Sequence, residues 1–374
     1  MRCLRMGLIG GGVGSLIGPV HRIAAELDGR IALVAGTFSS DPQRSVQSGE
    51  SYGVDPARAY ASVDDMLAGE AGRPDGIELV AIATPNHLHL SAAQAALAAG
   101  LAVISEKPAT ATLAEAEALS RSVQWSGRPY ALAYTYTGFP MVREARRQVA
   151  AGAIGRVRKV VVEFSQGWLA VAMEALGSKQ AGWRVDPEKS GIGGCIADLG
   201  THAFNLAEFV TGDQVAEVMA DLGSVVDGRR LDDDAAVLLR FSNGARGVLI
   251  ASQIATGEAS SVQLKVYGDV GALSWDLKTP DQLLLSRLDG GIEVLVEDAV
   301  KLARTAQRAA ALPGAFAPLI LAFADIYRDF ADVLVGDGDG TYLQGVDAGL
   351  RGMAFVERSV LASREQHGWT ELSV

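Results

Sequence analysis

The sequence predicts an α/β domain built on a doubly wound parallel sheet, followed by an α+β domain with a large, open, mostly antiparallel sheet. Two observations lead to this expectation. Up to residue 136, short apolar runs alternate with helical patterns, which is typical of repeated βα units. From residue 137 onward, long strands of alternating polarity are separated by glycine-containing turns. We therefore place the two domains at residues 1–136 and 137–374.

The first domain alternates strands and helices. Continuous apolar runs, which suit strands covered on both faces, predict strands at residues 5–9, 31–35, 79–83, 102–104 and 130–134. Helical spacing of apolar residues predicts helices near 20–27, 89–99 and 113–123, the last opened by a capping box at 112–115. Ligands of such sheets bind at the carboxyl ends of the strands. We therefore expect residues 10–18, 37–40, 84–87 and 106–108 to converge on one crevice.

The glycine-rich segment 10–18 predicts a dinucleotide site. It follows a strand, opens a helix and departs from G-x-G-x-x-G by three inserted residues, so that Gly18 takes the third role, close packing of helix on strand. Backbone N–H groups and the helix N-terminus would bind the pyrophosphate. The expected cofactor contacts in this loop are Gly10, Gly12, Val13, Gly14, Ser15, Leu16 and Ile17.

The end of the second strand leaves the choice between NAD and NADP open. No carboxylate occupies the place that would bind the adenosine ribose, although Asp41 is near. Ser39, Ser40 and Arg44 could bind a 2′-phosphate, or they could be a helix cap and a solvated arginine.

The second domain has the sequence pattern of an antiparallel sheet. Strands are expected at 157–164, 216–226, 235–241, 246–255, 262–267, 272–275, 283–288 and 292–296, with hairpin turns at 242–244 and 289–291. Two helices, near 320–335 and 345–363, close the chain and could return to the first domain. Because two helices are few for so many strands, we expect one sheet face to be buried in a homodimer or homotetramer.

An aspartate and a histidine form a candidate proton-transfer site at the start of a helix expected near Asp198. Asp198 and His202 are four residues apart and share one helical face. The alternative is a helix cap with a packed histidine. Upstream, Trp183 and Arg184 could be a sugar platform and an anchor, or a core tryptophan with a surface arginine.

Composition limits the classes of partner. The 374 residues carry a net charge of −11, with 49% hydrophobic and 21% charged residues. This charge argues against nucleic acid and anionic membranes. We also expect no metal site, no signal peptide, a cytoplasmic location, and two reduced, mostly buried thiols, Cys3 and Cys195.

These motifs together resemble the glucose–fructose oxidoreductase, inositol dehydrogenase and rhizopine-catabolism family (Gfo/Idh/MocA) over essentially the whole chain. The most specific elements are Glu106-Lys107-Pro108, Asp198-x-x-x-His202 and the segment 84–89. The segments 10–21, 136–143 and 166–169 resemble the branch that includes levoglucosan dehydrogenase. Residues 313–318 depart from that branch, which could indicate a different substrate.

The resemblance implies an NAD(P)-dependent dehydrogenase that oxidises a secondary hydroxyl of a sugar, anhydrosugar, glycoside or cyclitol, with NAD favoured over NADP. It implies Lys107, Asp198 and His202 as catalytic residues, with His202 as the general acid/base. Further cofactor contacts would come from Thr84, Pro85, Asn86, His89, Glu106, Lys107 and Pro108, and substrate contacts from Lys107, Tyr136, Trp168, Trp183, Arg184, Asp198, Thr201 and His202.

The chemistry agrees with these roles. Oxidation of an alcohol removes a hydride, which a nicotinamide accepts, and a proton, which a histidine can accept near neutral pH. A lysine ammonium stabilises developing alkoxide charge. Two alternatives remain on the same fold: a non-catalytic sugar or cofactor sensor, and a glycoside-cleaving enzyme that uses transient oxidation.

Overall fold

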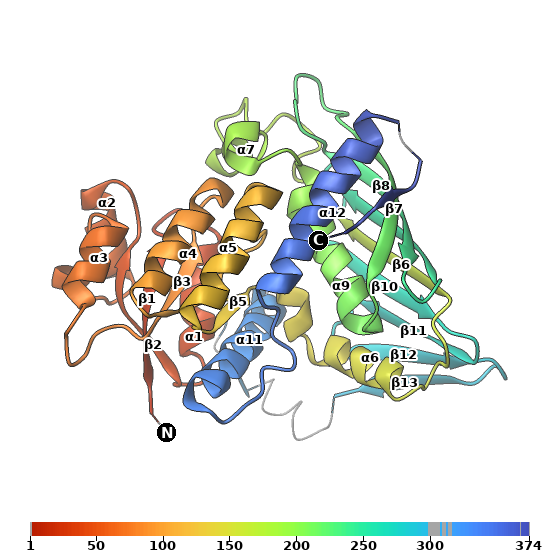
Figure 1. Cartoon of the computed structure of the whole chain (residues 1–374), viewed down its shortest axis with the longest axis horizontal. Helices are drawn as coiled ribbons and strands as arrows, with labels where there is room; N and C mark the ends of the chain where they lie inside the picture. The colour runs from red at the N-terminus through yellow and green to blue at the C-terminus, as the bar shows by residue number, and fades with distance from the viewer. Residues whose placement is uncertain (1, 298–306, 309–311, 313–315, 367, 374) are drawn as a thin grey trace. The chain divides into compact units, whose positions relative to one another are not determined.

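The computed structural model describes residues 2–297, 307–308, 312, 316–366 and 368–373 (Figure 1). The chain divides into two compact units. Unit 1 comprises Met1–Thr110, Ala114–Gly138 and Arg304–Gly349, and unit 2 comprises Ala111–Leu113, Phe139–Ala303 and Leu350–Val374. The passage after Gly138 lies close to the boundary expected from the sequence, and the late segment 304–349 belongs with unit 1. Residues 313–315 of the divergent stretch 313–318 lie outside the described residues.

Unit 1 is built on a parallel sheet of five strands in the order β2-β1-β3-β4-β5, which confirms the predicted doubly wound architecture. β1 pairs with β2 on one side and with β3 on the other, so the strand order reverses at β1. Ligands of such sheets bind at this reversal point. The strands are β1 (Leu4–Gly10), β2 (Ile31–Thr37), β3 (Leu79–Ala83), β4 (Ala102–Ser105) and β5 (Tyr130–Leu132).

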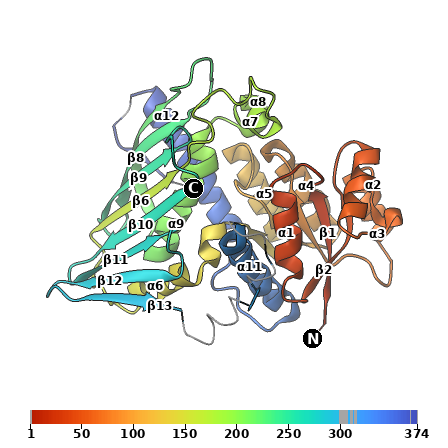
Figure 2. The same ribbon diagram turned by 180° about the vertical axis from the view of Figure 1, so that it is seen from behind.

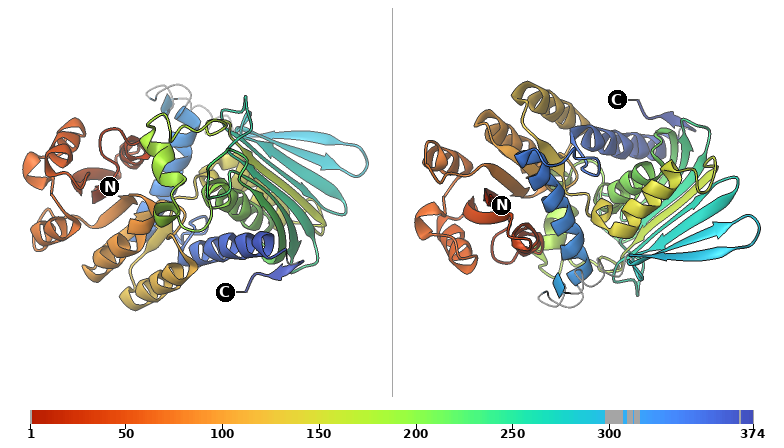
Figure 3. Two further views of the ribbon diagram at one scale, coloured as in Figure 1. Left: turned by 90° about the horizontal axis from the view of Figure 1, so that it is seen from above. Right: turned by 90° about the horizontal axis from the view of Figure 1, so that it is seen from below.

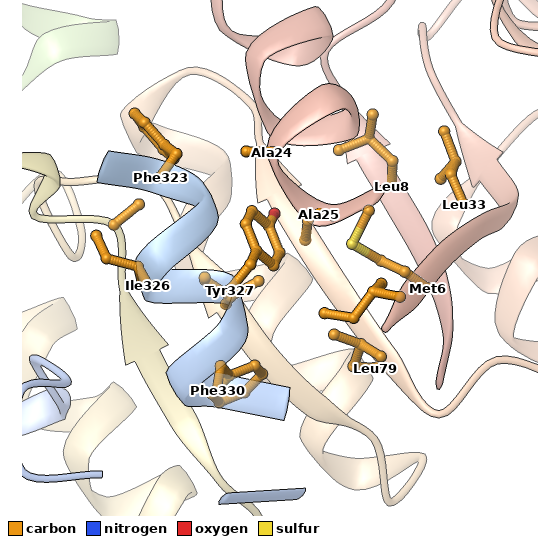
Figure 4. Packing of buried hydrophobic residues seen from close by; sticks show 14 of the residues in the cluster. Met6, Leu8, Ala24, Ala25, Leu33, Leu79, Phe323, Ile326, Tyr327 and Phe330 are labelled. Atoms are coloured by element: carbon orange, nitrogen blue, oxygen red, sulfur yellow. The ribbon is translucent and has the colours of Figure 1, made fainter. Parts of the chain in front are cut away.

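Helices cover both faces of this sheet. They are α1 (Ile17–Glu26), α2 (Pro42–Ser51), α3 (Val63–Glu70), α4 (His89–Ala98), α5 (Leu113–Ser126) and α11 (Ala317–Val335), with short 3₁₀ turns η1 (Pro56–Arg58), η2 (Asn86–Leu88) and η3 (Thr135–Gly138). Figure 2 shows that α11, although late in the chain, runs beside α1. Phe323, Tyr327 and Phe330 of α11 enter the buried cluster that contains Met6 and Leu8 of β1 (Figure 4).

Unit 2 is built on a sheet of nine strands in the order β13-β12-β11-β10-β6-β9-β8-β7-β14. Every neighbouring pair is antiparallel except β6 and β9, which confirms the predicted mostly antiparallel sheet. The strands are β6 (Lys159–Ser165), β7 (Val215–Gly223), β8 (Asp234–Phe241), β9 (Arg246–Ser252), β10 (Ser261–Tyr267), β11 (Gly271–Asp276), β12 (Gln282–Arg287), β13 (Ile292–Val296) and β14 (Thr370–Glu371).

One face of the nine-stranded sheet carries the helices α6 (Pro140–Ala150), α9 (Thr201–Thr211) and most of α12 (Val346–Arg364) (Figure 3). The rings of Phe204 on α9 and Phe355 on α12 stack with centroids 4.4 Å apart. In the described part of this unit, no helix covers the other face (Figure 3). Two short helices, α7 (Lys179–Arg184) and α8 (Pro187–Ser190), lie in the connection after β6.

Two expectations need correction. The helical segment expected near Asp198 begins at Ile196 as a π-helical turn, η4 (Ile196–Gly200), which contains Asp198. It continues as the α-helix α9 from Thr201. The sequence carries no strong signal for a π-helical turn, which depends on tertiary packing. Cys3 is exposed rather than buried, because it lies just before β1 begins, whereas Cys195 is buried. No helix in the described residues is long and apolar enough to cross a membrane.

Candidate active site

The loop after β1 has the backbone geometry of a phosphate-binding turn. Gly10, Gly11 and Gly14 have φ values of +80°, +69° and +89°, a region that side chains other than glycine rarely adopt. A Cβ atom at Gly18 would lie 1.7 Å from the carbonyl oxygen of Gly11. Only glycine fits there, which confirms that Gly18 permits close packing of α1 on the strand end. The loop and the N-terminus of α1 therefore form a cradle of backbone groups that suits a pyrophosphate.

Phe38 at the end of β2, Ser48 on α2 and Tyr52 just beyond α2 hold this loop, and sequence reasoning missed the last two. The N–H of Gly12 donates to the carbonyl of Phe38 at 3.2 Å, and the N–H of Val13 donates to Ser48 Oγ at 3.0 Å. Tyr52 Oη donates to the carbonyl of Gly11 at 2.6 Å. The N–H groups of Gly12 and Val13 are already hydrogen-bonded within the protein. We therefore expect the N–H donors for a pyrophosphate farther along the loop, toward Gly14, Leu16 and Ile17.

The end of β2 presents hydroxyl groups and an arginine. The carboxylate of Asp41 accepts hydrogen bonds from the N–H groups of Gln43 and Arg44, at 2.9 and 3.2 Å, and so caps α2. Ser39 Oγ accepts from the N–H of Asp41 at 3.1 Å. Ser40 and Arg44 are exposed. Asp41, rather than Ser39 or Ser40, therefore caps α2, while Arg44 extends into solvent from the first turn of α2.

The segments after β3 and β4 are joined by a buried histidine. The ring nitrogens of His89 lie 2.8 Å from the carbonyl of Pro108 and 2.9 Å from that of Thr84. Burial lowers the pKa of His89, against the two carbonyls, which raise it. The Lys107–Pro108 peptide bond is cis. Asn86 is buried beside these segments, and Thr84, Pro85, Glu106 and Lys107 are half-buried. Within unit 1, the structure thus places the predicted residues of β1, β3 and β4 at one edge of the sheet.

In unit 2, Asp198 is held by two side chains. Arg184 Nε lies 3.2 Å from Asp198 Oδ2, and Gln253 Nε2 donates to the same oxygen at 2.9 Å. Gln253 is buried just beyond β9 and was not predicted, because a lone glutamine carries no recognisable spacing. Arg184 and Asp198 are each about one-fifth exposed, so the pair keeps contact with solvent.

Aromatic rings surround this ion pair. The guanidinium of Arg184 lies 4.2 Å from the ring centroid of Trp183 and 5.8 Å from that of Trp168. Arg184 also donates to the carbonyl and side-chain oxygens of Gln180. The arginine is therefore oriented by contacts on several sides rather than free on the surface.

His202 lies one turn beyond Asp198, nearly buried, with its ring 5.8 Å from the ring of Phe164 on β6. The N-terminal approach to this turn is fixed by Asp232, whose carboxylate accepts from the N–H groups of Gly194 and Ile196, both at 2.6 Å. Thr201 is fully buried and its hydroxyl donates to the carbonyl of Ala197 at 2.8 Å, a helix contact. Tyr136 is buried in η3 of unit 1.

The described ranges contain no group of three or more His, Cys, Asp or Glu side chains able to hold a metal ion.

Comparison with known proteins places both halves of the chain. Residues 4–134 match the family described as "Oxidoreductase family, NAD-binding Rossmann fold", and residues 142–274 match "GFO/IDH/MocA C-terminal domain". The chain is 31% identical over 381 residues to the uncharacterized oxidoreductase YfiI of Bacillus subtilis (strain 168), covering 98% of this chain and 96% of the relative. It is 28% identical over 321 residues to levoglucosan dehydrogenase of Pseudarthrobacter phenanthrenivorans, covering 76% of each.

A solved structure is similar over nearly the whole fold. The inositol dehydrogenase homolog from Azotobacter vinelandii, complexed with NAD⁺, has a TM-score of 0.89 and 32% sequence identity, and covers 99% of this chain and 97% of that one.

Proposed function

Because the chain belongs to the GFO/IDH/MocA oxidoreductase family, we propose that it oxidises a secondary hydroxyl of a sugar, anhydrosugar, glycoside or cyclitol to a ketone, with NAD or NADP as the hydride acceptor. The chain is an oxidoreductase with an NAD-binding Rossmann domain. The substrate class and the residue roles below are the proposal.

The observation that carries the proposal is the carboxyl edge of the five-stranded sheet. There the glycine loop, shaped by Gly11 and Gly18, occupies the end of β1, and Lys107 follows β4 in the same sheet. A dinucleotide cradle with a cationic side chain at the same edge suits a reaction in which negative charge develops on an oxygen near the cofactor. A merely structural turn at the end of β1 does not require a lysine at the same edge of the sheet.

Different residues of the protein perform different parts of the proposed reaction. A bound nicotinamide supplies the hydride acceptor. Lys107 stabilises the negative charge that develops on the substrate oxygen, and His202 accepts the hydroxyl proton. Asp198, oriented by Arg184 and Gln253, accepts hydrogen bonds from substrate hydroxyls. Trp168 and Trp183 provide stacking surfaces for a sugar ring.

NAD is proposed as the preferred cofactor. A solved homolog with 32% identity to this chain contains NAD⁺. The carboxylate nearest the end of β2, that of Asp41, keeps its negative charge while it caps α2, so it should weaken the binding of a 2′-phosphate. NADP is therefore expected to bind as well, more weakly than NAD.

A screen of secondary alcohols tests the proposal. The purified protein is mixed with NAD⁺ or NADP⁺ and with inositols, levoglucosan, aldoses and simple glycosides, and formation of NADH or NADPH is recorded. We expect reduced cofactor from at least one polyol or sugar, and its loss in Lys107→Met. Cofactor binding without turnover of any compound would favour a sensor, and release of free sugar without net reduced cofactor would favour a glycoside-cleaving enzyme.

A further inference from the structure

Three polar side chains of unit 1, two of them fully buried and one half-buried, form a continuous hydrogen-bonded chain that the proposed chemistry does not use. Tyr327 Oη lies 2.7 Å from His21 Nδ1, and His21 Nε2 lies 2.8 Å from Glu106 Oε1. The three residues come from α11, α1 and the end of β4, and His21 and Tyr327 are 306 positions apart in the sequence. Glu106 directly precedes Lys107.

The direction of the hydrogen bonds follows from the donors available. Burial, with the negative charge of Glu106, raises the pKa of Tyr327 well above its usual value, so its hydroxyl keeps its proton and can donate to Nδ1. The proton of a neutral imidazole is then on Nε2, which donates to the Glu106 carboxylate. The chain thus runs as tyrosine to histidine to carboxylate, with every polar atom of the imidazole used.

Packing around the imidazole holds the hydrogen-bonded side chains of Tyr327, His21 and Glu106 in one arrangement. His21 is fully buried, and its ring contacts the rings of Phe323 and Tyr327 edge-on, with centroids 5.2 and 5.9 Å away. Phe323 and Tyr327 are one turn apart on α11, so they enclose the imidazole from one helix. The backbone N–H of Glu106 donates to the carbonyl of Ile82 at 2.9 Å, which fixes the other end of the chain on β3.

We propose that Tyr327 and His21 are positioning residues for Lys107: they hold the carboxylate of Glu106 against α1 and α11, and so fix the loop from which Lys107 acts. This inference rests on the proposed function. Without the imidazole, the Glu106 side chain would lose its partner and rotate, and the adjacent ammonium is an opposite charge with which it could pair. Lys107 would then be drawn from the place where cofactor and substrate meet, which connects α11 to the cofactor site through a single hydrogen-bonded path.

The test is a double-mutant cycle read by NADH binding. The Kd for NADH is measured by cofactor fluorescence for wild type, Tyr327→Phe, Glu106→Ala and the double variant. Tyr327→Phe removes one hydroxyl and keeps the buried ring, and it should weaken NADH binding about two- to tenfold, the size expected for one net hydrogen bond. In the Glu106→Ala background the same change should have no further effect, because the path to Lys107 is already cut.

Tyr60→Phe is the matched control. Tyr60 Oη donates to Glu70 Oε1 at 2.9 Å, so this variant also removes a tyrosine–glutamate hydrogen bond from unit 1, away from the β4 end. It should lower the melting temperature and leave the Kd for NADH unchanged. A Tyr327→Phe variant that behaves like this control, or that weakens binding equally in both backgrounds, overturns the inference.

Glu106→Gln provides a second test of the positioning role if Tyr327→Phe does not fold. The amide oxygen still accepts from His21, so Glu106→Gln should retain most of the NADH affinity that Glu106→Ala loses, and equal losses in the two variants contradict a positioning role. If wild type binds neither NADH nor NADPH, the proposed function itself fails, an outcome distinct from a wild type that binds while the cycle is additive.

Discussion

At the residue scale, His202 is the group on which the proposed proton transfer depends. His202→Ala should lower kcat by about 10²–10⁴-fold and leave NADH binding nearly intact, because it removes proton transfer only. His202→Asn serves as the control, since it keeps a polar side chain of similar size in this nearly buried position but cannot act as the base. Both variants should lose turnover, and His202→Asn, which leaves the smaller cavity, should lower the melting temperature less than His202→Ala. Near wild-type turnover in either folded variant would exclude His202 as the proton acceptor.

Arg44 is the residue that tests the proposed preference for NAD. We expect wild type to bind NAD more tightly than NADP, and Arg44→Ala to change the Kd for NAD by less than about twofold, as for an ordinary exposed side chain. Titrations with both cofactors, with the exposed neighbour Gln43→Ala as control, measure this. A wild type that strongly prefers NADP, together with loss of that preference in Arg44→Ala only, would show that Arg44 binds the 2′-phosphate.

At the scale of elements, the contact between α1 and the loop after β1 leaves no room for a side chain. Gly18→Ala puts a methyl group 1.7 Å from the carbonyl oxygen of Gly11, so α1 must move. We expect a loss of stability of about 1–3 kcal/mol or more, together with loss of NADH binding, measured by urea unfolding and fluorescence titration. Gly182→Ala on α7, where a Cβ meets nothing within 4 Å, should change neither. Tight NADH binding by Gly18→Ala would contradict the role of this contact.

The buried carboxylate of Asp232, which holds the segment before the π-helical turn, should make the free energy of unfolding depend on pH. Burial raises the pKa of Asp232 to about 6, against two backbone N–H groups that lower it. The folded chain therefore holds this proton more tightly than the unfolded chain, so the free energy of unfolding contributed by Asp232 falls as the pH rises from about 4 to 6 and is constant above that. The change is on the order of 3 kcal/mol.

Urea unfolding of wild type and Asp232→Asn between pH 4 and 7 isolates this contribution. The asparagine does not titrate, so the stability of wild type relative to the variant should decline through that pH window. A difference between the two proteins that stays constant with pH would show that Asp232 is not the titrating group.

At the scale of the whole molecule, the uncovered face of the nine-stranded sheet exposes apolar side chains to solvent. The strand register places Leu238, Val248 and Val161 in one row across β8, β9 and β6, and this row continues through Lys265 and Ser274 to Leu284 and Val294. Leu238, Leu284 and Val294 are 43%, 40% and 51% exposed. A mixed apolar and polar face of this kind suits contact with a second copy of the same chain.

We therefore expect a homodimer or homotetramer in solution, measured by light scattering at micromolar concentration. The double variant Leu238→Lys, Leu284→Lys should dissociate it, because two desolvated ammonium groups are costly at an interface. Trp125→Lys, at an exposed position on α5 of unit 1, should leave the assembly unchanged. A monomeric wild type would overturn the expectation.

The sequence alone was sufficient for the two sheets and for most of their strands. Alternation along β8 and β9, and the continuous apolar runs of β1 and β3, directly reflect which faces are buried, and this periodicity is a local property of the chain. The glycine loop was predicted for the same reason, since a left-handed backbone or a missing Cβ requires glycine at that position. Gly18 confirms this, because nothing larger fits against Gly11.

Only the tertiary structure decided which distant residues meet. The partners of Glu106 are a histidine on α1 and, through it, a tyrosine on α11, and the partner that joins Arg184 on Asp198 is Gln253. The late segment 304–349 belongs to unit 1 although it follows strands β6 to β13 of the second sheet. Such contacts have no spacing in the sequence, because they depend on how separate elements pack, and one hydrogen bond between remote side chains leaves no periodic pattern to read.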